Sequence, residues 1–301
     1  MTCPFLKEVQ VKYCIASSVR KLIPIAAAGR AEEKCSSAAH ATCPVYRMQP
    51  SEPAGSGSCP CLGESLMQYC GAVAVAKMVP YSEIVLSRCG NNRYRYCELY
   101  LGMANPGVPA DQVDGIAVPD GLRYSANHMW LDVGEDGLCH AGMDAFLSRA
   151  LGPAERISFV WQTGQHRATA VVTVNGVDHD VVFPNPFLLT GCNLYLRTNP
   201  APLTSAPYTG GWLFEGVAMP ETTENLLRGA VARDWMEQEQ RGINEFLQQL
   251  YDPTLYNNPK GRLAADGGVF VRGLSHYLDR DQMLALFHEF FSPLRVKRDQ
   301  P

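Results

Sequence analysis

Long apolar runs, a secretion signal and an excess of one charge are all missing from this chain, and each absence removes a class of protein. No apolar run reaches the roughly 20 residues of a membrane-spanning helix, and residues 1–15 lack the basic and then apolar order of a signal peptide. Acidic and basic residues number 30 and 26, so no global charge predicts binding to nucleic acid or to a membrane surface. We therefore expect a cytoplasmic protein that does not bind membranes.

Signatures of the common enzyme classes are missing too. The chain has no P-loop, no dinucleotide-binding glycine fingerprint and no nucleophile elbow. His288-Glu289 lacks the second histidine that would complete a helical metalloprotease motif. The sequence therefore gives no support for an enzyme, and we assign no catalytic residue.

Cysteine, by contrast, is abundant and belongs to a duplication. Nine of the 11 cysteines precede residue 98. The pattern that runs from Cys3 to Pro24 recurs 56 positions later, and the pattern from Cys35 to Tyr46 recurs 54 positions later. Each copy holds four cysteines, and the Ser-, Gly- and Pro-rich stretch Gln49–Ser58 between the copies is typical of a flexible linker.

Four retained thiols in each copy favour a metal site, with zinc as the first choice and an iron–sulfur cluster as the alternative. For one repeat to hold one ion, the segment between Cys3 and Cys14 has to turn back, and Lys7-Glu8 or Gly63-Glu64 is the expected place. We also expect Cys89–Cys97 to reverse direction. Whether the two sets share one site is left open. The predicted ligands are Cys3, Cys14, Cys35, Cys43, Cys59, Cys70, Cys89 and Cys97.

Other roles for these cysteines remain open. They could pack as small apolar residues or form disulfides and redox pairs. Cys61, Cys139 and Cys192 have no counterpart in the duplication, and we expect them to be plain packing residues.

Basic residues alternate with aromatic ones in the second copy only. The segment Arg88–Tyr96 contains Arg88, Arg93, Arg95 and two tyrosines, the composition of a nucleic-acid contact. The first copy has no comparable patch, so we favour a solvated hairpin face and do not expect nucleic acid as a partner.

The middle of the chain resembles a known family through motifs that occur in the family's order. The first is Tyr124-x-x-Asn127-His128-x-Trp130, the strongest is Tyr208–Phe214, and the last is the helical stretch Pro220–Glu239. They are similar to motifs of the glycine cleavage system H-protein. The resemblance implies a hybrid barrel-sandwich of antiparallel strands like that of lipoyl and biotinyl carriers, and hence an α+β chain.

In those carriers a modified lysine stands at the tip of a β-hairpin. The corresponding hairpin is Val171–Pro184, where Asn175-Gly176 is a preferred two-residue turn and Gly176 occupies the lysine position. The chain has no lysine between Lys77 and Lys260, so the resemblance implies a carrier-like unit without lipoate or biotin. Asp178 and His179, beside the turn, are expected to be solvated loop.

Other segments have structural interpretations. His128 is expected to pack within the family motif and His140 to lie at an exposed strand end. Gly102–Leu122 predicts a long connection with little regular structure. Asp234–Leu250 predicts an amphipathic helix, and Asp279 is the expected N-cap of a last helix. The expected domains are two cysteine-rich modules at 1–48 and 59–101, the H-protein-like unit at 121–239 and a helical extension at 240–301.

Three functions fit these observations. The first is a non-lipoylated H-protein-like scaffold or adaptor that binds a protein partner through two metal-binding cysteine modules. The second is an iron–sulfur protein for electron transfer or redox sensing, and the third is a nucleic-acid binder built on zinc modules.

Overall fold

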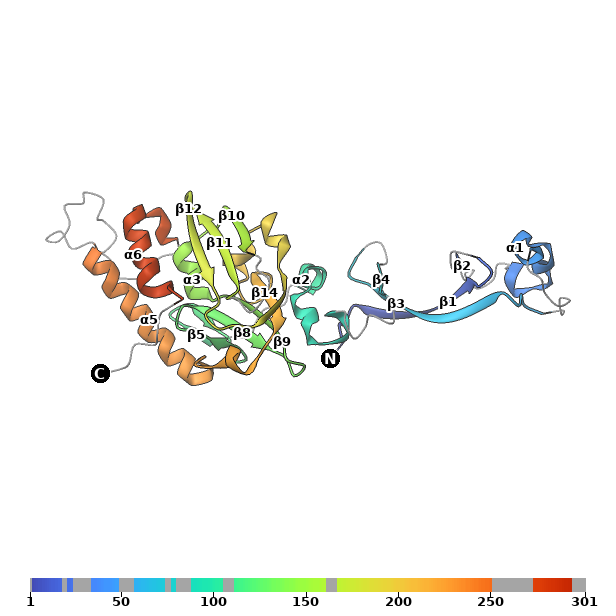
Figure 1. Cartoon of the computed structure of the whole chain (residues 1–301), viewed down its shortest axis with the longest axis horizontal. Coiled ribbons are helices and arrows are strands. Elements are labelled where there is room, and N and C mark those ends of the chain that lie inside the picture. Colours follow the sequence, from blue (N-terminus) through green and yellow to red (C-terminus); the bar gives the residue numbers. More distant parts are fainter. Residues whose placement is uncertain are drawn as a thin grey trace. The chain divides into compact units, whose positions relative to one another are not determined.

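The computed structural model shows an α+β protein made of two units, residues Met1–Ala104 and Asn105–Pro301 (Figure 1). The predicted α+β class is confirmed at this level, because antiparallel sheets and helices are both present. The structure describes residues 2–17, 21–23, 34–48, 57–73, 77–79, 88–104, 111–160, 167–250 and 273–293.

The first unit, unit 1, is built on an antiparallel ribbon of two long strands, β1 (Leu6–Cys14) and β3 (Leu62–Cys70). The short strands β2 (Lys21–Ile23) and β4 (Lys77–Val79) complete the sheet in the order β2-β1-β3-β4. Gln10 lies opposite Leu66, which is its own equivalent in the second repeat. The two repeats are therefore paired about a local two-fold axis.

The predicted reversal at Lys7-Glu8 or Gly63-Glu64 is wrong. Both positions lie inside continuous strands, and β1 pairs with β3 residue by residue over nine positions. Apolar or aromatic residues alternate with polar ones from Val9 to Tyr13, a pattern that favours extended backbone over a turn. Cys3 precedes β1 and Cys14 is its last residue, so the two cysteines lie at opposite ends of one strand.

Short helices surround the cysteines in the second half of each repeat, with Cys35 and Cys89 inside a helix and Cys43 and Cys97 between two helices. The first copy contains η1 (Lys34–Ser36), η2 (Ala38–Thr42) and α1 (Pro44–Arg47), and the second copy contains η4 (Arg88–Gly90), η5 (Asn92–Tyr96) and α2 (Glu98–Ala104). Ser37 and Asn91 cap equivalent helices through their side chains. The hairpin expected around Arg88–Tyr96 is therefore replaced by 3-10 turns, in which Tyr94 and Tyr96 are buried.

The second unit, unit 2, contains three antiparallel sheets. The largest has the order β13-β14-β9-β8-β7, the second is β10-β11-β12, and the small β5–β6 hairpin forms the third. Within the described residues, no sheet closes into a barrel. The strands are β5 (Asp111–Val113), β6 (Ile116–Val118), β7 (Arg123–Tyr124), β8 (Met129–Val133), β9 (Leu138–Met143), β10 (Arg156–Val160), β11 (Thr169–Val174), β12 (Val177–Val182), β13 (Leu188–Cys192) and β14 (Trp212–Val217).

Helices cover these sheets and extend the unit. The helix α5 (Gly229–Leu250) runs without a break across the predicted boundary at residue 239, and α6 (Arg280–Phe291) begins at Asp279, the predicted N-cap. Phe246 and Phe290 join the two helices, with ring centroids 5.7 Å apart. The shorter helices are α3 (Ala145–Leu151), η6 (Leu194–Arg197), α4 (Pro202–Ser205), η7 (Pro220–Thr223) and η8 (Leu274–His276).

The segment expected to be an irregular connection is partly ordered. Its β5–β6 hairpin buries Ile116 and Val118 almost completely, which the prolines and glycines around it did not indicate. None of the helices in the described ranges is long and apolar enough to cross a membrane.

Candidate functional site

The β11–β12 hairpin has the turn that its sequence predicts. Val174 pairs with Val177, and the two residues between them, Asn175 and Gly176, have φ values of 50° and 71°. Both are positive, as a type I′ turn requires, and the expected Asn-Gly turn is confirmed. Gly176 is exposed, and a Cβ added to it would meet no atom within 4 Å.

The C-terminal extension, defined here as residues 273–293, contacts this hairpin. The Asn175 side-chain amide donates a hydrogen bond of 2.6 Å to the Ser275 carbonyl oxygen. The Ser275 hydroxyl in turn donates to the Leu151 carbonyl oxygen, at 2.7 Å. The turn is thus tied to the body of the unit.

His179 on β12 packs against the same extension. Its ring lies 4.7 Å from that of Phe287 on α6, and its side chain is only 2% exposed, so the expected solvated loop is wrong here. Burial lowers the pKa of His179, although the charges of Asp178 and Asp180 raise it. Neither ring nitrogen has a hydrogen-bond partner among the described residues. A neutral histidine that packs against the Phe287 ring contributes to the core at this position.

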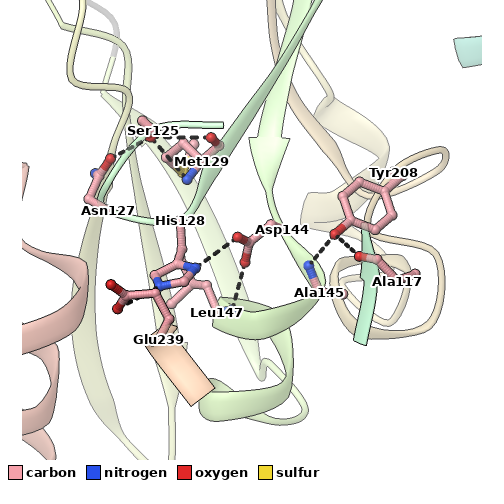
Figure 2. Close-up of polar contacts among 10 residues, drawn as sticks. All are labelled: Ala117, Ser125, Asn127, His128, Met129, Asp144, Ala145, Leu147, Tyr208 and Glu239. Atoms are coloured by element: carbon pink, nitrogen blue, oxygen red, sulfur yellow. Dashed lines mark hydrogen bonds and ion pairs between the residues drawn. The ribbon is translucent and has the colours of Figure 1, made fainter. Parts of the chain in front are cut away.

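A second group of polar residues is fully enclosed beneath the sheets (Figure 2). The His128 ring has one nitrogen, Nδ1, 2.8 Å from the Asp144 carboxylate and the other, Nε2, 3.5 Å from the Glu239 carboxylate. Its faces stack on Phe146 and Trp235, with centroids at 4.2 and 4.7 Å. The exposed fractions of His128 and Asp144 are zero, so neither side chain is accessible to solvent.

Asp144 performs two tasks in this group. One carboxylate oxygen pairs with His128, and the other accepts the Leu147 backbone N–H at 2.9 Å as the N-cap of α3. His128 itself has a φ of 63°, a left-handed conformation that is uncommon outside glycine. Packing within the family motif was predicted for His128 and is confirmed. No sequence pattern indicated Asp144 or Glu239 as its partners.

Comparisons with known proteins relate the middle of the chain to one family. No protein-family model matches the chain. The glycine cleavage system H protein of Micrococcus luteus is 33% identical over 105 residues, which are 33% of this chain and 80% of that protein. The chain belongs to the glycine cleavage system H protein family. The H protein of Deinococcus deserti is 31% identical over 119 residues, which are 94% of its length.

A solved H protein gives a further structural comparison. The H protein of Mycobacterium marinum has 21% sequence identity to this chain and a TM-score of 0.32, over 42% of this chain and 99% of that protein. The sequence matches to the H proteins of M. luteus and D. deserti cover 33% and 38% of this chain.

The H-protein-like motifs have structural roles in this chain. The Tyr208 hydroxyl donates to the Ala117 carbonyl oxygen at 2.6 Å and accepts from the Ala145 backbone N–H at 3.0 Å. Burial raises the pKa of Tyr208 well above its usual value, so the hydroxyl stays protonated. The Trp130 indole N–H donates to the Pro207 carbonyl oxygen. These residues join separate segments of the unit.

His140 differs from its expected place. It lies in β9 with a side-chain exposure of 2%, so the predicted exposed strand end is wrong. Its Nε2 is 3.8 Å from the Glu215 carboxylate, and its ring meets Trp212 edge-on at 5.2 Å. Both partners come from β14, the neighbouring strand, so His140 joins two strands of the large sheet.

All eleven cysteines lie in the described ranges, and none of them forms a disulfide there. Cys139 and Cys192 lie in unit 2, where burial raises the pKa of Cys139 to about 12 and that of Cys192 to about 11, as in inert packing residues. In unit 1, burial raises the pKa of Cys3, the Phe5 and Leu6 backbone N–H groups lower it, and the charges of Cys70 and Cys97 raise it again. Cys3 is therefore within electrostatic reach of two cysteines of the other repeat.

Cys61 has a similar environment at the other end of unit 1. Burial raises its pKa, and the thiols of Cys59, Cys14 and Cys43 raise it further. Among the described residues, no three His, Cys, Asp or Glu side chains are arranged to hold a metal ion. The thiols at each end are therefore near one another, but their side chains are not oriented toward one common ion.

The buried ion pair predicts a pH-dependent stability for unit 2. Burial by itself lowers the pKa of His128, but the charge and hydrogen bond of Asp144, with those of Glu239, raise it above its usual value. A raised pKa in the folded state adds stability that is complete below about pH 6.5 and is lost as the pH rises through the folded-state pKa. We expect the free energy of unfolding to fall across that range, as measured by denaturant titration at several pH values.

The matched control for this pH effect is His128→Asn. Asparagine tolerates a positive φ and does not titrate, so the variant is expected to lose the decline in stability above pH 6.5. An unchanged pH dependence in this variant would assign the effect to another group.

Proposed function

We propose that this protein is a non-lipoylated H-protein-like scaffold or adaptor, whose unit 2 presents a carrier fold without a carrier arm. One observation supports this most directly. The hairpin of the carrier fold is present with its Asn175-Gly176 turn, while no lysine occurs anywhere between Lys77 and Lys260. An arm that is attached through a lysine amine has no point of attachment in this unit.

The contacts of the hairpin also support this proposal. A swinging arm needs a tip that projects freely, so that it can visit several active sites. Here the tip residue Asn175 is hydrogen-bonded to Ser275, and His179 packs on Phe287. The extension that covers the hairpin thus replaces a mobile display site with a fixed surface.

A scaffold needs a partner, and the proposal assigns this role to another protein. Two buried polar residues of unit 2, His128 and Tyr208, are engaged in structural contacts rather than open to a substrate. The relatives are named as glycine cleavage system proteins, so components of such a system are the first partners to test. In unit 1 the proposal assigns metal ions, zinc first, to the eight repeat cysteines.

Intact-mass spectrometry of the purified protein tests the missing arm. We expect the mass calculated from the sequence, and no adduct after incubation with lipoate or biotin and the corresponding ligase. An established lipoyl carrier treated in parallel serves as the positive control. A covalent acyl or cofactor arm on residues 121–239 would overturn the proposal.

The alternative functions concern unit 1. An iron–sulfur redox protein would use the same cysteines with a different metal, and metal analysis separates it from the zinc scaffold. A nucleic-acid reader would need free aromatic rings for stacking. Tyr94 and Tyr96 are only 8% and 6% exposed, which disfavours that role.

A further inference from the structure

In unit 1, the first cysteine of each repeat is hydrogen-bonded to the other repeat. The Cys3 backbone N–H donates to the Cys89 carbonyl oxygen at 2.8 Å, and the Cys59 N–H donates to the Cys35 carbonyl oxygen at 2.7 Å. These two hydrogen bonds are equivalent under the repeat. Each joins the first cysteine of one copy to the third cysteine of the other.

The strand register brings the second cysteine of each copy to the same places. Cys70 lies opposite Leu6, and the Gly71 N–H bonds to the Phe5 carbonyl oxygen, beside the turn that begins at Cys3. By the same symmetry Cys14 lies opposite Leu62, and the Ile15 N–H bonds to the Cys61 carbonyl oxygen. Each end of the ribbon therefore gathers cysteines from both repeats.

The fourth cysteine completes each group. The Cys97 N–H bonds to the Tyr94 carbonyl oxygen at the end of η5, and its equivalent Cys43 bonds to the His40 carbonyl oxygen at the end of η2. The Phe5 ring, beside Cys3, lies 6.0 Å from the Tyr100 ring on α2, the helix that follows Cys97. In Figure 1 the short helices α1 and α2 of unit 1 stand at opposite ends of the ribbon. The two groups are therefore separate.

Distance excludes the arrangement in which each repeat holds its own ion. A strand rises about 3.3 Å per residue, so the nine residues of β1 separate Cys3 from Cys14 by roughly 30 Å. Zinc–sulfur bonds of about 2.3 Å require all four ligands within roughly 4 Å of each other. No single ion reaches both cysteines.

We propose that each end of the β1–β3 ribbon binds one zinc ion through four thiolates, three from one repeat and one from the other. This inference rests on the part of the proposed function that assigns metal to unit 1, and it fixes which cysteines share an ion. The two ligand sets are Cys3, Cys70, Cys89 and Cys97 at one end, and Cys14, Cys35, Cys43 and Cys59 at the other.

Local backbone geometry supports thiolate ligands at the exchanged positions. Cys3 and Cys59 each begin a turn, closed by hydrogen bonds from Leu6 and Leu62 to their carbonyl oxygens at 3.0 and 2.9 Å. The two exchanged cysteines therefore occupy equivalent turns at the two ends of the ribbon.

Binding has a defined chemical balance. Four thiols at each end lose their protons to solvent and form four bonds to Zn²⁺, leaving a net charge of −2 on each centre. Because the thiols are not yet arranged around an ion, binding must draw them together at each end. Zinc uptake should therefore release protons.

Metal counting on double variants separates the shared arrangement from the repeat-internal one. We expect two zinc ions per wild-type chain, one in Cys3→Ser/Cys70→Ser, and none in Cys3→Ser/Cys14→Ser, by native mass spectrometry and elemental analysis. If each repeat held its own ion, the zinc counts of the two double variants would be interchanged. That result would overturn the inference while leaving metal binding intact. Cys61→Ser and Cys139→Ser are matched controls that should keep both ions.

A measurement on the wild-type protein removes any dependence on how the variants fold. During stepwise chelation, cysteines released with the same ion become reactive to iodoacetamide together, and peptide mapping identifies them. We expect Cys3 to become reactive with Cys89, and Cys59 with Cys35. Release of Cys3 with Cys35 would contradict the inference, and iron with acid-labile sulfide would contradict the assignment to zinc. A wild-type chain without metal would overturn both the inference and the metal assignment on which it rests.

Discussion

Replacing Asp144 by alanine is expected to lower the free energy of unfolding of unit 2 by about 3–5 kcal/mol. The substitution leaves the fully buried His128 without its 2.8 Å carboxylate partner, in a pocket formed by Phe146 and Trp235. It also removes the acceptor that caps α3 at Leu147, a loss that typically costs about 1 kcal/mol. Chemical denaturation near pH 6 measures the total.

Asp144→Asn is the matched control, because it keeps a side-chain oxygen for the Leu147 N–H and removes only the charge. Its stability is expected to lie between those of the wild type and the alanine variant. The stability of this variant should depend much less on pH above pH 6.5. A small dependence should remain, because Glu239, at 3.5 Å, still interacts with His128. Equal stability of wild type and Asp144→Ala would show that the pair contributes nothing to folding.

This ion pair shows where inference from sequence ends. Burial of His128 follows from its place between Asn127 and Trp130 in a recognisable motif. Its partners come from a different strand–helix junction and from a helix far along the chain, and a single sequence contains no signal of such contacts. The same holds for His140 and His179. Both were predicted to be exposed but are buried, because the strands and helices that cover them are distant in sequence.

Features that depend on neighbouring residues were predicted more accurately. The Asn175-Gly176 turn needs two positive φ angles in succession, which few other dipeptides tolerate, and it forms as expected. Asp279 caps α6 through a contact within one turn, and that prediction is confirmed as well. Both outcomes are decided by local chemistry.

The duplication in unit 1 is an intermediate case. Repetition of the cysteines was visible in the sequence, but the way in which the copies meet was not. Closing each repeat on itself required a turn in a segment whose alternating pattern favours a strand. Two copies of one strand can instead pair about a two-fold axis through Gln10 and Leu66 and satisfy each other's backbone groups.

Removing zinc from the native protein is expected to unfold unit 1 and to leave unit 2 folded. The described part of unit 1 buries few apolar side chains, namely Cys3, Cys59, Cys70, Ala72, Tyr94 and Tyr96, and half of these are proposed ligands or their equivalents. A core this small rarely sustains a fold by itself, whereas structural zinc binding contributes about 10–16 kcal/mol at pH 7.

Hydrogen exchange with and without a chelator measures this loss. Backbone amides of β1 and β3 should lose protection when the ions leave, while amides of β9 and β14 in unit 2 should keep theirs. Cys3→Ser sharpens the test, because it removes one ligand from one end only. The Leu6 end of the ribbon should then open before the Cys14 end. Full protection of both strands in the metal-free chain would mean that strand pairing alone holds the two repeats together.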